Sequence, residues 1–192
     1  MKNLLVLLSK CIIGSAFIGG MIGTPVYSQS IFPLDEKGEI VYSEVVKVDS
    51  AKSSELFVRA HEWFANTFKS AKAVIQLDDK EAGKIVGKGV FDVSDNNNHN
   101  SLIYVPWIGT VDFTVEIQTK DGRYKYVLSN IVYTNTGTGY QEDLRLIAPF
   151  TKGMYHERLN KQWSDIRQNT NTTILNMIDG LKKSMNTNTN NW

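Results

Sequence analysis

The stretch VDFTVEIQTKDGRYKYVLSNIVY, residues 111–133, constrains the fold more than any other part of the sequence. Apolar and polar residues alternate around Asp121-Gly122, a pair that favours a two-residue type I′ turn, so the stretch predicts a β-hairpin. A turn at this place makes the numbers of paired residues sum to 243. The predicted pairs are Ile117 with Tyr126, Val115 with Leu128, and Val111 with Val132. Both apolar sets therefore lie on one side of an antiparallel sheet.

Three other segments are rich in β-branched residues and predict further strands. They are EIVYSEVVKV (39–48), AVIQL (73–77) and GKIVGKGVFDV (83–93). Lys37-Gly38 predicts a turn before the first strand, and residues 78–83 join the other two. The polar segment SDNNNHNS, residues 94–101, predicts a loop before the hairpin.

Two regions have the apolar spacing of helices that bury one side. The first is residues 53–69, where Trp63, Phe64 and Phe68 give a strongly aromatic core face, and its N-cap candidates are Asp49, Ser50, Ser53 and Ser54. The second runs from Gly153 to Met185. The poor helix formers of QNTNTT, residues 168–173, leave open whether this region is one helix or two. The order β-α-β-β-β-β-α predicts an α+β fold, an antiparallel sheet with helices packed on one face.

The first 28 residues have the pattern of a secretory signal peptide. Lys2 is basic, residues 4–23 are mainly apolar, and Val26 and Ser28 stand at positions −3 and −1 of a cut after Ser28. An uncleaved membrane anchor is the alternative, because the apolar run approaches the ~20 residues that span a bilayer. Lys10 and four glycines disfavour that alternative. We therefore expect export, with the protein in the periplasm, outside the cell or at the cell surface, and no stable membrane insertion after cleavage.

Removal of the signal peptide changes the charge and the thiol content of the chain. The 21 Lys and Arg residues lose Lys2 and Lys10, which leaves 19 basic against 20 acidic residues. A chain so close to neutrality offers no general attraction for nucleic acid. Cys11 is the only cysteine, so the processed chain holds no disulfide. We divide it into an α+β domain over residues 29–150, a helical region over 151–185 that packs on or extends from the domain, and a disordered tail over 186–192.

Three segments together resemble a known family: FPLDEKGEIVYSEVVKV, ELFVRAHEWFANTFKSAKAVIQLDDKEAGKIVGKG and VDFTVEIQTKDGRYKYVLSNI. The family is a secreted bacterial domain of unknown function with a TBP-like (TATA-binding-protein-like) fold. The resemblance covers residues 32–133 and is most specific from Trp63 to Gly89. It implies the fold and an exported location but assigns no functional residues. DNA binding does not follow from it, because fold alone does not carry function and this chain has one copy of the unit and little net charge.

The loop between the second and third strands carries the charged residues that most resemble a site: Asp78, Asp79, Lys80, Glu81 and Lys84. It lacks the spacing of a phosphate-binding or dinucleotide-binding loop. A turn explains these residues more simply, with Gly87 and Gly89 marking a bulge or a close backbone approach. A ligand-binding recognition loop on the surface is the other interpretation. Tyr104 and Trp107 are a second candidate, as an exposed contact patch.

The composition suggests neither a metal site nor a cofactor site. His61, His99 and His156 lie far apart in the sequence, and no pair has metal-ligand spacing. We therefore expect no metal, no cofactor and no catalytic residue.

Three functional hypotheses follow. The first is an exported, non-enzymatic module that binds a protein, a peptide or an envelope component, with no nucleic-acid partner. The second is a hydrolase or other enzyme that uses Asp78, Asp79 and Glu81. The third is an assembly protein that associates with itself through the C-terminal helix; the sequence leaves the oligomeric state open.

Overall fold

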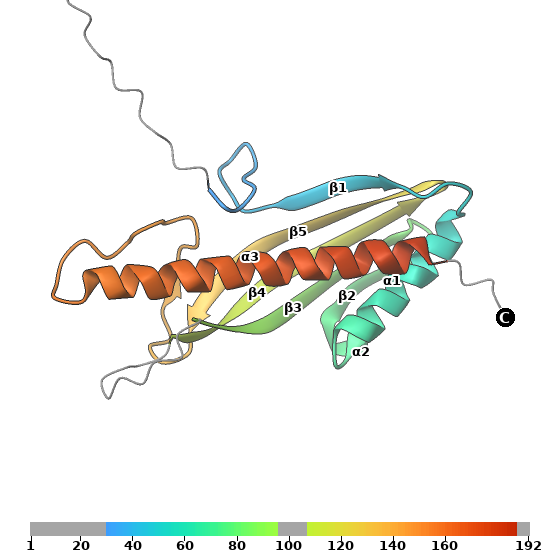
Figure 1. Ribbon diagram of the computed structural model, residues 1–192. Coiled ribbons are helices and arrows are strands. Elements are labelled where there is room, and N and C mark those ends of the chain that lie inside the picture. Colours follow the sequence, from blue (N-terminus) through green and yellow to red (C-terminus); the bar gives the residue numbers. More distant parts are fainter. Residues whose placement is uncertain (1–29, 96–106, 188–192) are drawn as a thin grey trace, which may run out of the picture.

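The computed structural model describes residues 30–95 and 107–187 (Figure 1). The predicted signal peptide, Tyr104, His99 and residues 188–192 of the predicted tail lie outside the described residues. The described strands are β1 (Tyr42–Lys47), β2 (Ile75–Asp79), β3 (Lys84–Ser94), β4 (Ile108–Lys120), β5 (Arg123–Asn135) and β6 (Gln141–Glu142). The described helices are α1 (Ser53–Thr67), α2 (Ala71–Val74) and α3 (His156–Asn186).

The strands form one antiparallel sheet in the order β1-β5-β4-β3-β2, and β6 pairs with β5. Helices α1 and α3 cover the same face of this sheet (Figure 1). The predicted α+β fold class is therefore confirmed. The sequence did not predict α2 or β6, and Ala73 and Val74 lie in α2 instead of the predicted strand. No helix within residues 30–95 and 107–187 is long and apolar enough to cross a membrane.

The Asp121-Gly122 turn holds the start of α1 as well as the hairpin. Gly122 has a φ of +73°, but Asp121 does not have the positive φ that a type I′ turn also requires, so the predicted turn type was wrong. The predicted register nevertheless holds from Thr114 to Lys120. The backbone N–H of Gly122 donates to the Ala51 carbonyl at 2.8 Å. The Asp121 carboxylate accepts from the backbone N–H of Ser53 at 2.8 Å, so this distant side chain caps the helix. The predicted local caps were wrong: Lys52 is the N-cap residue, without a side-chain cap.

A β-bulge in β5 changes the register beyond Thr114. Asp112 lies opposite Val132 and Thr114 opposite Ser129, so Asn130 and Ile131 together face the single residue Phe113. Asn130 has a φ of +54°, a left-handed conformation that Asn tolerates better than most residues. The predicted pair of Val111 with Val132 was therefore wrong, because Val111 lies opposite Tyr133. The extra residue turns Tyr133 into the core, where it is fully buried.

Helix α3 is continuous over 31 residues, so the QNTNTT segment does not break it. The polar residues of this segment have tertiary partners that outweigh their weak helix propensity. The amide of Asn169 donates to the Ser94 carbonyl at 2.7 Å, and the Tyr42 hydroxyl donates to Asn171 at 2.6 Å. Thr170 between them is completely buried. Trp163 on the same helix packs edge-on against Tyr133.

The aromatic face of α1 packs where β3 has no side chains. Trp63 and Phe64 are buried as predicted, and Phe68 packs against the same core. A Cβ added to Gly87 would lie 2.5 Å from the Phe64 ring, and one added to Gly89 would lie 2.5 Å from the Phe113 ring. The two glycines therefore make room for aromatic rings, whereas the sequence suggested a bulge or a close backbone approach.

We expect the bulge to depend on the backbone conformation of Asn130. Replacement by Val places a β-branched residue at positive φ and should lower the free energy of unfolding by about 1–2 kcal/mol more than replacement by Gly. Both variants lose the same hydrogen bond from Asn130 to Thr114, so Asn130→Gly is the matched control. Urea denaturation measures the difference. Equal stability of Asn130→Val and Asn130→Gly would contradict this account of the bulge.

Candidate functional site

The edge of β5 has a break between the strands that pair with it. On this edge β1 pairs with residues 123–128 and β6 pairs with Tyr133 and Thr134. Tyr133 and Thr134 also pair with β4, so β6 must lie on the same side of β5 as β1. Residues 129–132, which contain the bulge, therefore have no partner strand on that side in the described part of the chain.

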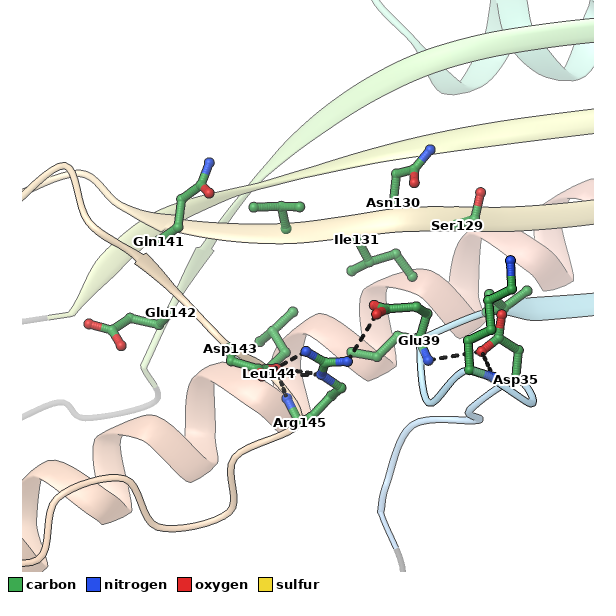
Figure 2. A pocket seen from close by; sticks show the side chains of 14 residues that line it. Asp35, Glu39, Ser129, Asn130, Ile131, Gln141, Glu142, Asp143, Leu144 and Arg145 are labelled. Atoms are coloured by element: carbon green, nitrogen blue, oxygen red, sulfur yellow. Dashed lines mark hydrogen bonds and ion pairs between the residues drawn. The ribbon is translucent and has the colours of Figure 1, made fainter.

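A cavity of about 590 Å³ lies at this break. It is lined by three segments: residues between 35 and 41, residues 129–132 of β5, and residues 141–145, which include β6 (Figure 2). The lining combines carboxylates, amides and two cations with apolar side chains such as Ile131 and Leu144. Its concave shape is shared with ligand sites, but most of the lining residues are polar or charged.

The first wall is a tight turn that Asp35 organises. Its carboxylate accepts from the backbone N–H groups of Lys37 and Glu39, both at 2.9 Å. Gly38 has a φ of +79°, and its N–H donates to the Asp35 carbonyl at 2.9 Å. An aspartate that bonds its own following backbone is a recurrent way to build such a turn. The predicted Lys37-Gly38 turn is confirmed, although no pattern in the sequence indicated that it borders a cavity.

Arg145 joins this turn to the segment after β6. Its guanidinium donates to both carboxylate oxygens of Asp143 at 2.9 to 3.1 Å, and its Nη1 donates to the Gly38 carbonyl at 3.1 Å. The same Nη1 lies 3.2 Å from Glu39 Oε1 (Figure 2). The hydrogen bonds from Arg145 lower the pKa of Asp143, and those to Asp143 raise the pKa of Arg145. The planar guanidinium thus fixes two otherwise separate loops.

Arg167 of α3 supports the third wall of the cavity, residues 141–145, from the core side. Its Nε donates to the carbonyl of Leu144 at 2.8 Å, and its guanidinium lies over the Phe32 ring. Arg167 is only 5% exposed, and burial lowers its pKa. The wall is therefore attached to the core through a buried side chain.

The chemistry of the cavity suits the binding of a polar chain better than catalysis. Asp143 and Glu39 are engaged by Arg145, and Asp35 is engaged by backbone N–H groups. The lining of the cavity holds no His or Cys, so it offers neither an imidazole nor a thiol for nucleophilic catalysis. In the described part of the chain, no group of three or more His, Cys, Asp or Glu is placed to hold a metal ion.

The residues predicted as a ligand loop, Asp78 to Lys84, lie elsewhere, at the β2–β3 turn. Asp79 accepts from the backbone N–H of Ala82 at 2.9 Å, and Gly83 has a φ of +62°. Lys80 and Glu81 are exposed. Asp78 lies 2.9 Å from His61 Nε2, whereas Lys84 pairs with Glu116 at 3.0 Å. The charged groups therefore have separate partners and do not converge on one point.

Trp107 is half-buried beside α3. Its ring packs edge-on against Phe150 and Trp163, with centroid distances of 5.4 and 6.1 Å. Its backbone N–H donates to Asp95, which also accepts from Gln162 at 2.8 Å. The proposed Tyr104 and Trp107 patch stays a prediction, because Tyr104 lies outside the described residues.

Sequence reasoning missed the cavity because its walls come from segments with unremarkable local patterns. Asn130 was one possible signal, since it interrupts the apolar alternation of the hairpin. The partners of Arg145 could not be inferred from spacing, because Glu39 lies 106 residues away in the sequence.

Comparison with known proteins supports the fold. The family described as domain of unknown function (DUF4468) with TBP-like fold matches residues 42–134, which confirms the resemblance seen in the sequence. A crystal structure of a DUF4468 family protein from Bacteroides ovatus has a TM-score of 0.62 at 16% identity, covering 84% of this chain and 94% of that one. A TBP-like protein from Parabacteroides distasonis has a TM-score of 0.60 at 17% identity, covering 81% of this chain and 97% of that one. No curated protein matches the chain.

The Arg145 contacts predict an acid-sensitive contribution to stability. Because Arg145 lowers the pKa of Asp143 below the value of about 3.9 in an unfolded chain, the interaction contributes fully above that pH. Its contribution should disappear as the pH falls through the folded pKa of Asp143. We expect Arg145→Gln to raise the Asp143 pKa toward its ordinary value, as measured by NMR titration of the carboxyl carbon. Arg123→Gln on the exposed hairpin is the control, and an unchanged Asp143 titration in Arg145→Gln would refute the assignment.

Proposed function

We propose that this chain, whose residues 42–134 belong to the DUF4468 family with its TBP-like fold, is an exported binding module without enzymatic activity. The cavity at the break in the β5 edge is its binding site. The ligand is a polar protein or peptide segment, or a polar component of the cell envelope.

The observation that carries this proposal is the cavity of about 590 Å³ whose charged walls are already held in place. Arg145 contacts both Asp143 and Glu39 in the free protein, so a ligand meets a preformed surface and little ordering has to accompany binding. The bulge adds backbone groups of Asn130 and Ile131 that no strand pairs with in the described part of the chain. Backbone and amide groups of this kind can fix the orientation of a peptide-like ligand.

The alternatives have less support. The carboxylates of the β2–β3 turn are divided between a turn hydrogen bond at Asp79 and a contact with His61 at Asp78, so they do not favour a hydrolase. Self-association through α3 would need an apolar surface on that helix. Its large buried residues, including Trp163, Ile174 and Leu181, already face the chain's own core.

Export predicts a specific N-terminus. The signal-peptide pattern of residues 1–28 supports cleavage after Ser28, so the chain expressed with its own N-terminus should begin at Gln29. Intact-mass spectrometry of the protein from envelope and extracellular fractions measures this. A chain that keeps Met1 or Lys2 and stays in the cytoplasm would contradict export, and Lys2→Glu with Lys10→Glu is a variant expected to reduce it.

Binding at the cavity predicts position-specific crosslinking. We expect a photoreactive residue at Gln141, which lines the cavity, to form an adduct with an envelope component under illumination. Arg145→Glu should abolish this adduct because it reverses the charge that holds both walls. The same photoreactive residue at Lys125, on the exposed sheet face, is the control. Identical adducts from both positions, or an adduct at Gln141 that survives Arg145→Glu, would refute binding at this cavity.

A further inference from the structure

The edge of β3 is open beyond the end of β2. The pairing of β2 with β3 ends with Ile75 opposite Gly87, whereas β4 pairs with β3 as far as Ser94. Residues 88–94 of β3 therefore have a partner strand on one side only, in the part of the chain that the structure describes. Figure 1 shows β3 continuing well past β2. This edge is separate from the cavity, because β4 lies between β3 and β5.

The hydrogen-bond pattern shows which residues present backbone groups on this edge. The N–H of Thr119 donates to Gly83 at 2.8 Å, and the N–H of Asp95 donates to Trp107 at 3.0 Å, at the two ends of the β3–β4 ladder. Both bonds involve odd-numbered residues that flank β3, Gly83 and Asp95, and in an antiparallel pair bonded and non-bonded positions alternate. Even-numbered residues between these ends therefore direct their N–H and C=O away from β4. The Ser94 carbonyl follows this rule, since it accepts from Asn169.

Three residues of the open stretch direct their backbone N–H and C=O groups away from β4 and have no partner strand there: Lys88, Val90 and Asp92. Their side chains are all exposed, and Val90 is 57% exposed. Lys88 and Asp92 form no ion pair with any other described residue. The edge therefore presents a cation, an apolar group and an anion at alternate positions, together with the free backbone groups of the same residues. Charges can protect an edge from uncontrolled pairing, and they also select which strand can pair with it.

The length of the open stretch decides what can occupy it. At one end Ile75 already pairs with Gly87, and at the other the Asn169 side chain donates a hydrogen bond to the Ser94 carbonyl. A second copy of β3 has the complementary charge order, but antiparallel pairing about Val90 would put Val93 of one copy opposite Gly87 of the other. Ile75 already occupies that place. A short extended peptide avoids this overlap.

We propose that residues 88–92 of β3 bind an extended peptide segment of a protein partner as an added antiparallel strand. The segment carries an acidic residue opposite Lys88, an apolar residue opposite Val90 and a basic residue opposite Asp92. Main-chain hydrogen bonds supply the attachment, and the alternate side chains supply the selectivity. This surface is independent of the cavity, so either site can be refuted without the other.

The first test uses the free protein. Hydrogen exchange followed by NMR should show fast exchange for the amides of Lys88, Val90 and Asp92, and slow exchange for Gly89, Phe91 and Val93, which bond to β4. Slow exchange of the even-numbered amides in the free protein would mean that the edge is already covered, and would overturn the proposal.

The second test adds the peptide acetyl-Lys-Thr-Val-Thr-Glu-amide to the purified protein. We expect the amide signals of Lys88, Val90 and Asp92 to shift and their exchange to slow. The same peptide with N-methylvaline at its centre keeps the side chain but loses the N–H that would donate to the Val90 carbonyl. It should not bind. The reversed peptide Glu-Thr-Val-Thr-Lys should bind about tenfold more weakly, because each charge then meets a like charge.

A charge exchange in the protein completes the test. Lys88→Glu with Asp92→Lys should invert the preference, so that the reversed peptide binds about tenfold more tightly than the original one. Lys47→Glu with Asp49→Lys exchanges charges on exposed residues at the opposite edge of the sheet, in and just after β1, and should leave both affinities unchanged. No binding of either peptide, equal binding of the N-methyl peptide, or a preference that does not invert would each overturn the proposal.

Discussion

In β5, Asn130 and Ile131 share the place opposite Phe113, and this extra residue determines which later side chains of the strand face the core. Before the bulge, even-numbered residues such as Tyr126 and Leu128 are buried; after it, Tyr133 is buried. Tyr133 packs against Trp163 of α3, so the bulge also helps to place the long helix. The cavity forms beside the same residues, where neither β1 nor β6 pairs with β5 in the described part of the chain. The core packing and the candidate site thus share one backbone irregularity.

The Asp121-Gly122 turn has a comparable role at the other end of the sheet. It closes the β4–β5 hairpin, bonds to Ala51 and Val48 through Gly122, and caps α1 through the Asp121 carboxylate. One short turn therefore fixes the position of β1, the start of α1 and the hairpin register. The strands β2 and β6 are short, with only five and two residues.

Short outer strands explain why both proposed surfaces lie at sheet edges. A longer β6 would cover the break at residues 129–132, and a longer β2 would cover residues 88–92 of β3. An exposed strand edge is a hazard that proteins usually block. Here one edge is bordered by the fixed Arg145, Asp143 and Glu39 contacts, and the other by Lys88 and Asp92. If the two proposals hold, charge on each edge restricts pairing to a complementary ligand, as expected of a binding module.

The sequence by itself determined the features that depend on neighbouring residues. Turn chemistry at Asp121-Gly122 gave the hairpin and its register as far as Leu128, and helical spacing gave the aromatic face of α1. Only the tertiary structure decided the bulge at Asn130, the continuity of α3 and the cavity. The reason is physical: these features depend on groups far apart in the chain, such as Tyr42 with Asn171 and Glu39 with Arg145, separated by 129 and 106 residues. Local propensities are small beside the free energy of such packing and hydrogen bonding, so a short window of sequence cannot contain the answer.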